Sequence, residues 1–222
     1  MLLLSTAYLA PVQYYAHLYA ADEVWEDRYE HYVKQTFRNR CYIATPDGPL
    51  ALTLPVVRNG ATRTATRDIR LSDHGNWRHL HWNALVSAYE SSPYFEYYAD
   101  DFRPLYERRF DFLVDFNEAL QQIVLEELAL TPHIQQTSAY YSECTPEITD
   151  LRQLLHPKAS TEADPLFQPQ PYYQVFAERT GFLPNLSIAD LLFNTNRLSG
   201  PMLKSKSAML RLGRKPVRSA KT

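Results

Sequence analysis

The first 26 residues follow a strand–helix–strand pattern, which constrains the fold more than any other feature of the chain. Leu2-Leu3-Leu4 is a short apolar run typical of a buried strand. Pro11 suits the first turn of a helix, so we expect a helix over Pro11–Ala20, followed by a second strand over Glu23–Glu26. A unit of this size predicts two parallel strands joined by a right-handed crossover.

After this unit the sequence changes from strands to helices. Arg38–Thr45 and Leu50–Val57 are rich in β-forming residues and flank the turn dipeptide Asp47-Gly48, which predicts a β-hairpin. Another short strand is expected over Asp68–Leu71. Three segments then have the length and apolar periodicity of helices: Asn76–Tyr89, Tyr94–Glu107 and Arg109–Leu130.

Towards its end the sequence predicts a loop, a strand and a helix. Pro157–Pro171 is proline-rich and is expected to be a long loop, and Tyr172–Phe176 is strand-like. Ser187 with Asp190 forms a capping-box pattern that would open a helix ending at Asn194. The fold class we expect is therefore α/β, with an N-terminal βαβ unit, a mixed sheet and a β-hairpin, followed by a helical second half.

Composition and charge exclude several functional classes. The 222 residues have a formal net charge of −2, which argues against a dedicated nucleic-acid binder. Six glycines, with no GxGxxG or Walker pattern among them, argue against a glycine-rich phosphate loop. Two cysteines, Cys41 and Cys144, are too few for a disulfide framework and fit a reducing cytoplasm.

The two ends of the chain differ from the rest. The apolar N-terminus lacks the basic region of a signal peptide, and no run is long enough to span a membrane, so we expect a cytoplasmic protein. The last 32 residues hold eight of the 23 basic residues and no acidic residue. We expect one domain over residues 1–200 and a basic, disordered tail over residues 201–222; the alternative is an arm that binds an anionic surface.

A basic cluster is the first candidate binding site. If a strand begins at Arg38, the side chains of Arg38 and Arg40 share one face and form a fork for phosphate or carboxylate, with Asn39 on the other face. Lys34 would add a further positive charge. The alternative is that the arginines pair with acidic residues of the same chain, such as Glu26, Glu30 or Asp68.

A histidine-rich segment is the second candidate. His79 and His81 point to nearly opposite sides of a helix, so we do not expect a metal site. The pairs that share a helix face are Trp77 with His81, Arg78 with Trp82, and His79 with Asn83. A histidine beside a tryptophan is a candidate acid–base group; the alternative is a packed aromatic face with a hydrogen-bonded histidine.

The order and spacing of these segments resemble the WbqC-like protein family of bacteria. The amino-acid sequence of residues 73–101 is similar to that of a shorter branch of the family, which is found in Bacteroides-type bacteria. The chain departs from the family pattern at Ala10, where proline is usual, and after Asn194. The stretches that resemble the family are Tyr8-Leu9 with Tyr14-Tyr15, Lys34 to Cys41, Leu52 to Val56, Trp77 to Trp82, Ser92 to Phe95, Pro184 to Ser187 and Asp190 to Asn194.

The resemblance implies a role in O-antigen or other surface-polysaccharide synthesis, because the family is named from such gene clusters. It implies a transferase that binds an anionic activated sugar, nucleotide or acyl donor, or a related glycan precursor. The alternative is a non-catalytic binding or scaffold protein of the same pathway. The sequence identifies no cofactor and leaves the oligomeric state open.

Specific residues follow from this hypothesis. His81 is the acid–base candidate and Glu26 its possible carboxylate partner, at the end of a strand. Tyr8 lies in the loop after the first strand, where α/β folds bind ligands, and would border the pocket. The remaining candidate substrate-binding residues are Lys34, Arg38, Asn39, Arg40 and Trp77.

Overall fold

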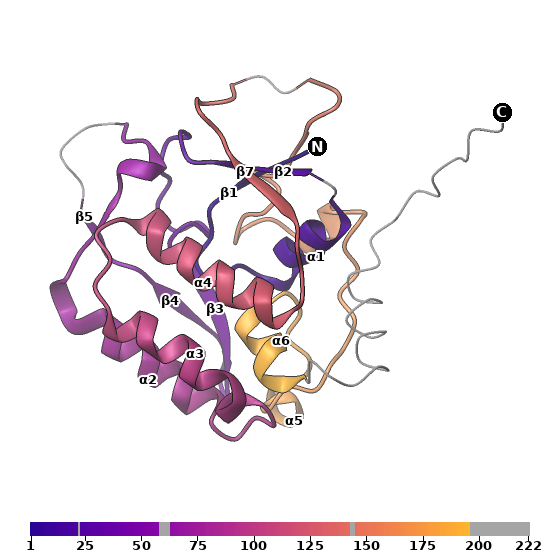
Figure 1. Ribbon diagram of the computed structural model, residues 1–222. Helices are drawn as coiled ribbons and strands as arrows, with labels where there is room; N and C mark the ends of the chain where they lie inside the picture. Colours follow the sequence, from indigo (N-terminus) through magenta and orange to yellow (C-terminus); the bar gives the residue numbers. More distant parts are fainter. Residues whose placement is uncertain (22, 58–62, 143–144, 196–222) are drawn as a thin grey trace, which may run out of the picture.

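The computed structural model describes residues 1–21, 23–57, 63–142 and 145–195 (Figure 1). Its centre is a parallel sheet with the strand order β7-β2-β1-β8. As expected, β1 and β2 pair in parallel across helix α1. The bounds are β1 Leu2–Ser5, α1 Val12–Ala20, β2 Glu23–Asp27, β7 His133–Gln136 and β8 Thr149–Asp150.

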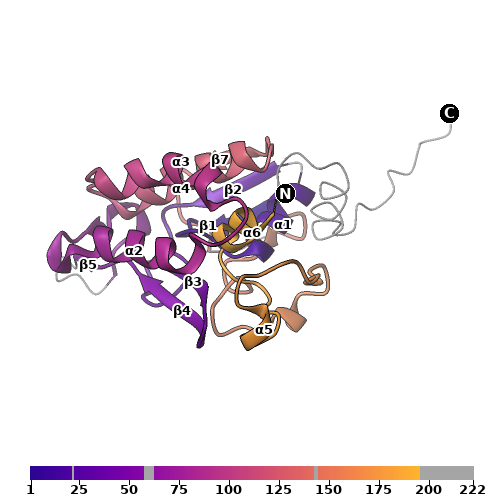
Figure 2. The same cartoon turned by 90° about the horizontal axis from the view of Figure 1, so that it is seen from below.

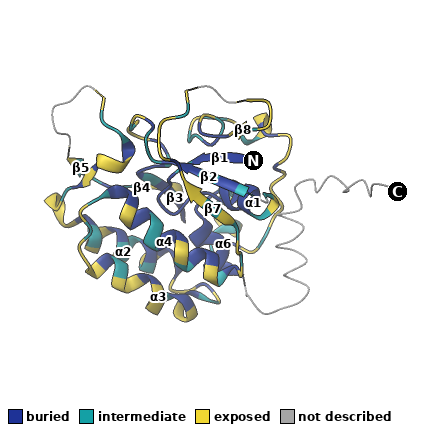
Figure 3. Ribbon diagram, turned by 45° about the horizontal axis from the view of Figure 1, so that its top comes forward, coloured by how far each residue is buried: buried dark blue, intermediate teal, exposed yellow. Residues whose placement is uncertain are grey.

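Burial explains why the first strand and helix form. Leu3 and Leu4 are fully buried, as expected for a parallel strand covered on both faces. Helix α1 is buried from Val12 through Leu18, and Pro11 is its N-cap residue. Figure 3 shows this region as the most continuously buried part of the molecule, together with helix α6 (Ile188–Asn194).

The β-hairpin forms with shifted ends. Strands β3 (Arg40–Thr45) and β4 (Gly48–Thr53) pair in antiparallel fashion, and Gly48 adopts a φ of 108° at the turn, which favours glycine. The expected strands Arg38–Thr45 and Leu50–Val57 are therefore wrong at their ends. Pro55 interrupts the second strand because it has no N–H to donate.

Residues after Pro55 form a separate antiparallel pair. Strand β5 (Val56–Val57) pairs with β6 (Arg70–Leu71), which is shorter than the expected strand Asp68–Leu71. Residues 66–68 form a 3₁₀ turn instead. The expected strand Tyr172–Phe176 is absent from the described part of the chain. The side chains of Tyr172 and Gln174 bind the Asp190 carboxylate of helix α6.

The helical half matches the expectation closely. Helices α2 (Trp77–Tyr89), α3 (Phe95–Glu107) and α4 (Leu113–Glu127) begin one to four residues later than predicted. In α4 the delay arises because Phe112 forms a β-bridge with Arg70. The α/β fold class, with a βαβ start, a hairpin and a helical second half, is confirmed.

Helix α6 is capped by only half of the predicted capping box. Ser187 Oγ accepts from the Ala189 N–H, as expected of an N-cap. The Asp190 carboxylate accepts instead from Tyr172 Oη at 2.5 Å and Gln174 Nε2 at 2.8 Å. The other half of the predicted capping box, a bond from the Ser187 N–H to this carboxylate, is therefore wrong. The predicted basic tail, residues 201–222, and Cys144 lie outside the described residues.

Within the described ranges, none of the helices combines the length and apolarity required to cross a membrane.

Candidate functional site

The strand order of the parallel sheet reverses at β1, and the candidate site lies at this point. From β1 the sheet extends to β2 and β7 on one side and to β8 on the other. Open α/β sheets bind ligands outside the carboxyl ends of their strands, where the strand order reverses. The residues at this edge are Ser5 at the end of β1, Thr6 and Ala7 directly after it, and Arg152 after β8.

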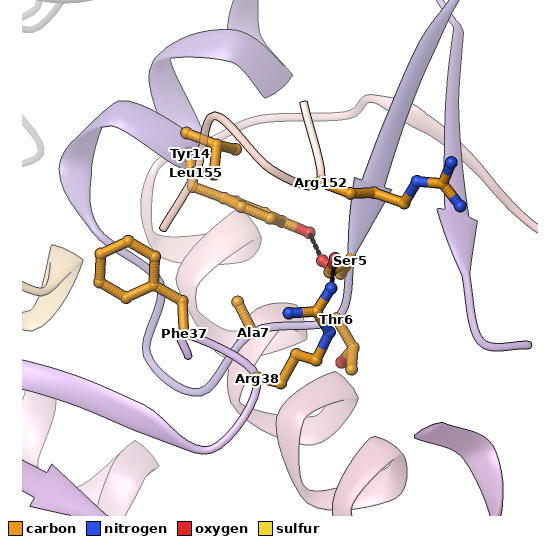
Figure 4. Close-up of a pocket in the computed structure, with 8 residues that line it drawn as sticks. All are labelled: Ser5, Thr6, Ala7, Tyr14, Phe37, Arg38, Arg152 and Leu155. Atoms are coloured by element: carbon orange, nitrogen blue, oxygen red, sulfur yellow. Dashed lines mark hydrogen bonds between the residues drawn. The ribbon is translucent and has the colours of Figure 1, made fainter. Parts of the chain in front are cut away.

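A small pocket opens at this edge of the sheet (Figure 4). Its volume is about 10 Å³, which is roughly enough for one water molecule. Figure 4 shows the Arg38 guanidinium beside Ser5, whereas the Arg152 guanidinium points away from Arg38. The pocket is lined by Ser5, Thr6, Ala7, Tyr14, Phe37, Arg38, Arg152 and Leu155.

Arg38 is a buried residue paired with Glu30. Its Nε donates to Glu30 Oε1 at 2.7 Å, and its Nη2 donates to Glu30 Oε2. The same guanidinium donates to Ser5 Oγ at 2.8 Å and to Thr36 Oγ1 at 3.1 Å. The structure therefore shows the alternative interpretation of Arg38, in which the fork holds a carboxylate of this chain.

Arg40 has a different environment. It opens β3, is half-buried, and donates from Nε to Thr53 Oγ1 at 2.8 Å. Within the described residues neither Arg40 nor the exposed Lys34 has a carboxylate at ion-pair distance. Because the strand begins at Arg40, Arg38 and Arg40 do not form one two-arginine fork.

Asn39 connects the basic segment to the neighbouring strand. Its Nδ2 donates to the Leu54 carbonyl at 3.1 Å, and its buried Oδ1 has no hydrogen-bond partner among the described residues. On the other side of the segment, Asn117 Nδ2 of α4 donates to the Arg38 carbonyl at 2.9 Å and to Thr6 Oγ1 at 3.2 Å. These bonds fix the segment against the loop after β1.

His81 belongs to a buried chain of hydrogen bonds. The Tyr8 hydroxyl lies 3.0 Å from His81 Nδ1 and 3.0 Å from the Tyr106 hydroxyl. Trp77 packs edge-on to the imidazole, with ring centroids 5.4 Å apart, as the helix spacing predicted. Burial lowers the pKa of His81 to about 4, so its imidazole is neutral at pH 7.

The structure gives His81 and Glu26 separate partners. Glu26 on β2 is buried and accepts from Arg28 Nε at 2.7 Å. Burial raises the pKa of Glu26, and the Arg28 charge opposes that shift. In the described structure no hydrogen bond or ion pair joins Glu26 to His81. His79 lies on the exposed side of α2 and contacts Asn83, as expected from the spacing.

Arg152 is a site residue that the sequence analysis missed. Its Nη1 donates to Asp27 Oδ2, and its Nη2 donates to Asp150 Oδ2 at 2.7 Å and to the Tyr141 carbonyl at 2.8 Å. Arg152 and Asp27 are 125 residues apart in sequence, and they meet only because β8 pairs with β1. No local pattern signals such a pair.

The described residues contain no group of three or more His, Cys, Asp or Glu side chains placed to hold one metal ion. Cys41 is a free, buried cysteine, and burial raises its pKa, so its thiol is protonated at neutral pH.

Comparison with known proteins gives two matches. Residues 6–164, which include all the candidate residues predicted from the sequence, match the WbqC-like protein family. The chain is also 28% identical over 190 residues to the uncharacterized protein Rv1507c of Mycobacterium tuberculosis, which covers 73% of this chain and 79% of that protein. No solved structure matches the chain.

Proposed function

Because the chain belongs to the WbqC-like protein family, we propose that it is a transferase of bacterial surface-polysaccharide assembly. Its donor would be an activated sugar, nucleotide or acyl compound that carries phosphate or carboxylate. The binding site would lie at the carboxyl edge of the parallel sheet, in the loops that follow β1 and β2. Family association with polysaccharide synthesis and the reversal of strand order at β1 both support this proposal.

The main support for the proposal is that Arg40 is half-buried and bonds to a neutral side chain. A half-buried guanidinium has lost part of its hydration, yet among the described residues the side-chain partner of Arg40 is the neutral hydroxyl of Thr53. Arg38, two residues earlier, already has its carboxylate in Glu30. An anionic donor group would supply Arg40 with the charge-assisted, bidentate partner that guanidinium groups favour. Lys34 would contribute a second, more mobile charge.

The other candidate residues take positioning and proton-transfer roles in this proposal. Arg38 and Asn39 hold the loop that presents Arg40, through Ser5 and Leu54. Tyr8 borders the site through its backbone, since its N–H donates to the Phe37 carbonyl at 2.8 Å.

Proton transfer is assigned to two of the buried titratable groups, His81 and Glu26. The neutral imidazole of His81, oriented by Tyr8 and Trp77, is the proposed base that accepts the proton of the acceptor nucleophile. Glu26, with its raised pKa, is the candidate acid at the neighbouring strand end.

Donor binding is tested with Arg40→Ala. We expect the affinity for UDP-glucose or acetyl-coenzyme A, whichever the wild type binds, to fall by ~1.5–3 kcal/mol, about 10- to 100-fold. The melting temperature should stay near that of the wild type, because the substitution breaks no ion pair within the described part of the chain. Arg179→Ala, at an exposed ion pair with Asp47, is the matched control. A large fall in melting temperature with unchanged binding, or no binding of either compound by the wild type, would contradict the proposal.

The scaffold alternative is separated from catalysis by His81→Gln. This variant keeps a polar side chain at a buried position but removes the imidazole. If the protein is a transferase, cells with a folded His81→Gln protein should lose the surface-glycan modification. A scaffold would support normal modification with this variant, and that result would overturn the catalytic role of His81.

A further inference from the structure

Helices α2 and α3 lie side by side (Figures 1 and 2). A second, much larger hollow is lined by residues near the start of α2 and the end of α3. Its volume is about 530 Å³, within the usual range of small-molecule sites. The pocket at the sheet edge has about 10 Å³ by the same measure. The hollow is therefore large enough for a ligand with a ring and a charged group.

Arginine side chains dominate the charge of this hollow. Arg78, Arg103 and Arg109 line it, together with the carboxylates of Asp73 and Glu107. Asp73 is shared, since it lies 2.7 Å from Arg78 Nη1 and 3.4 Å from Arg109 Nη2. Three guanidinium groups therefore face two carboxylates, which leaves a local positive excess.

The existing ion pairs do not satisfy these arginines fully. The side chains of Arg103 and Arg109 are 61% and 80% exposed, and exposed ion pairs contribute only about 0–1 kcal/mol, so an incoming anion can replace them. Arg78 Nε is buried, and the described part of the chain offers it no hydrogen-bond partner. A ligand with several acceptor oxygens would add bonds that the carboxylates do not make.

Aromatic rings form the remaining wall. Trp82 lines the hollow and packs against Phe95 and Tyr106, with ring centroids 6.1 Å and 5.8 Å away. These neighbours fix the indole, and a fixed aromatic side chain provides a stacking surface for a flat or apolar ring face. Tyr106 lines the same hollow, and its hydroxyl bonds to Tyr8 at 3.0 Å.

We propose that this hollow is a second ligand site, which binds a phosphorylated ring compound. Phosphate is favoured because its oxygens accept bonds from several guanidinium groups at once. The ring of the ligand lies against Trp82. The class includes sugar phosphates and nucleotides, which share this chemistry. The site uses none of the anion-binding residues of the proposed donor site and does not depend on that assignment.

Calorimetric titration of the full chain at low ionic strength tests the proposal. The probes are uridine monophosphate, glucose 1-phosphate and inorganic phosphate. We expect at least one of the two ring compounds to bind about tenfold more tightly than inorganic phosphate, since only ring compounds reach Trp82. The ring compound that binds more tightly identifies the ligand as a nucleotide or as a sugar phosphate.

Matched variants locate the binding. Arg103→Ala/Arg109→Ala should weaken the tighter ring compound by about tenfold or more, because two charge-assisted contacts are lost. Arg67→Ala/Arg179→Ala removes two exposed, ion-paired arginines elsewhere and should change the affinity by less than about twofold. The titration is repeated in the Arg40→Ala variant, which removes the proposed donor site: the ring compound should still bind, and Arg103→Ala/Arg109→Ala should weaken it by the same factor in that background. Equal binding of inorganic phosphate, equal losses in both double variants, or no binding at millimolar concentration would each overturn the proposal.

Discussion

The Tyr8 hydroxyl lies 3.0 Å from Nδ1 of His81, 73 residues further along the chain, and joins the loop after β1 to helix α2. The same hydroxyl reaches Tyr106 on α3. Both tyrosines are buried, and burial raises the pKa of each, so they remain protonated across the physiological range. One phenol thus connects the parallel sheet to both of the paired helices.

Removing the Tyr8 hydroxyl tests how much it contributes to stability. Tyr8→Phe leaves His81 Nδ1 and the Tyr106 hydroxyl without their buried partner, so we expect the free energy of unfolding to fall by ~1–3 kcal/mol. Urea denaturation with unchanged slope measures the change. Tyr97→Phe, at a residue that is 60% exposed, is the control and should stay within about 0.5 kcal/mol of the wild type. Equal stability of the two variants would show that the Tyr8 bonds contribute nothing net.

His81 should make stability depend on pH. Its pKa is about 4 in the folded state against 6.5 ordinarily, because burial disfavours the charged imidazole. Between these values the unfolded chain binds more protons than the folded chain, so stability falls as pH drops from 6.5 to 4. The loss due to this residue is at most about 3 kcal/mol.

The variant His81→Gln isolates that contribution. Its stability at pH 7 is not the relevant readout, since the substitution also alters the bond to Tyr8. The slope of unfolding free energy against pH between 4 and 6.5 should be shallower than in the wild type, because one titrating group is gone. Parallel slopes would mean that His81 is protonated as readily in the folded protein as in the unfolded chain.

Removing one partner of the buried Arg38–Glu30 pair should lower the free energy of unfolding much more than replacing both partners together. Arg38→Met leaves the Glu30 carboxylate buried without its cation, so we expect a loss of ~3–5 kcal/mol. The double variant Glu30→Leu/Arg38→Met removes both charges and should recover much of that loss. Chemical denaturation of the four proteins in this cycle measures the coupling. If the losses of the single variants simply add, the pair is not coupled.

The sequence predicted the fold where the local signal was strong. The apolar run at Leu2–Leu4 and the periodic helices α2 to α4 were located within a few residues. Strands β7 and β8 were missed because they are polar, exposed and short, and exist only through pairing with β2 and β1. Strand formation of this kind depends on tertiary context rather than on local propensity.

The candidate site divides in the same way. The Trp77–His81 contact follows from helix spacing alone and was predicted. The sequence analysis named three acidic residues as possible partners of Arg38, and in the structure the partner is Glu30. Contacts such as Tyr8 with His81, or Arg152 with Asp27, join distant segments, so no pattern within either segment encodes them.

Two buried carboxylates should respond to pH with opposite sign. Burial raises the pKa of Asp190, even though Tyr172 and Gln174 donate to it. Burial acts in the same direction on Asp164, but the bonds from Gln13 at 2.7 Å and His17 at 2.6 Å outweigh it and lower the pKa. The folded chain therefore holds the Asp190 proton more tightly than the unfolded chain does, and the Asp164 proton less tightly.

Asparagine at each position separates the two effects. Stability that depends on Asp190 is lost as pH rises above 3.8, so Asp190→Asn should lose less stability than the wild type between pH 4 and 7. Stability that depends on Asp164 is lost as pH falls below 3.8. In Asp164→Asn the free energy of unfolding should therefore fall less steeply below that pH than in the wild type. Unfolding curves recorded from pH 2.5 to 7 distinguish the two variants. Matching pH profiles for them would contradict the opposite environments of the two carboxylates.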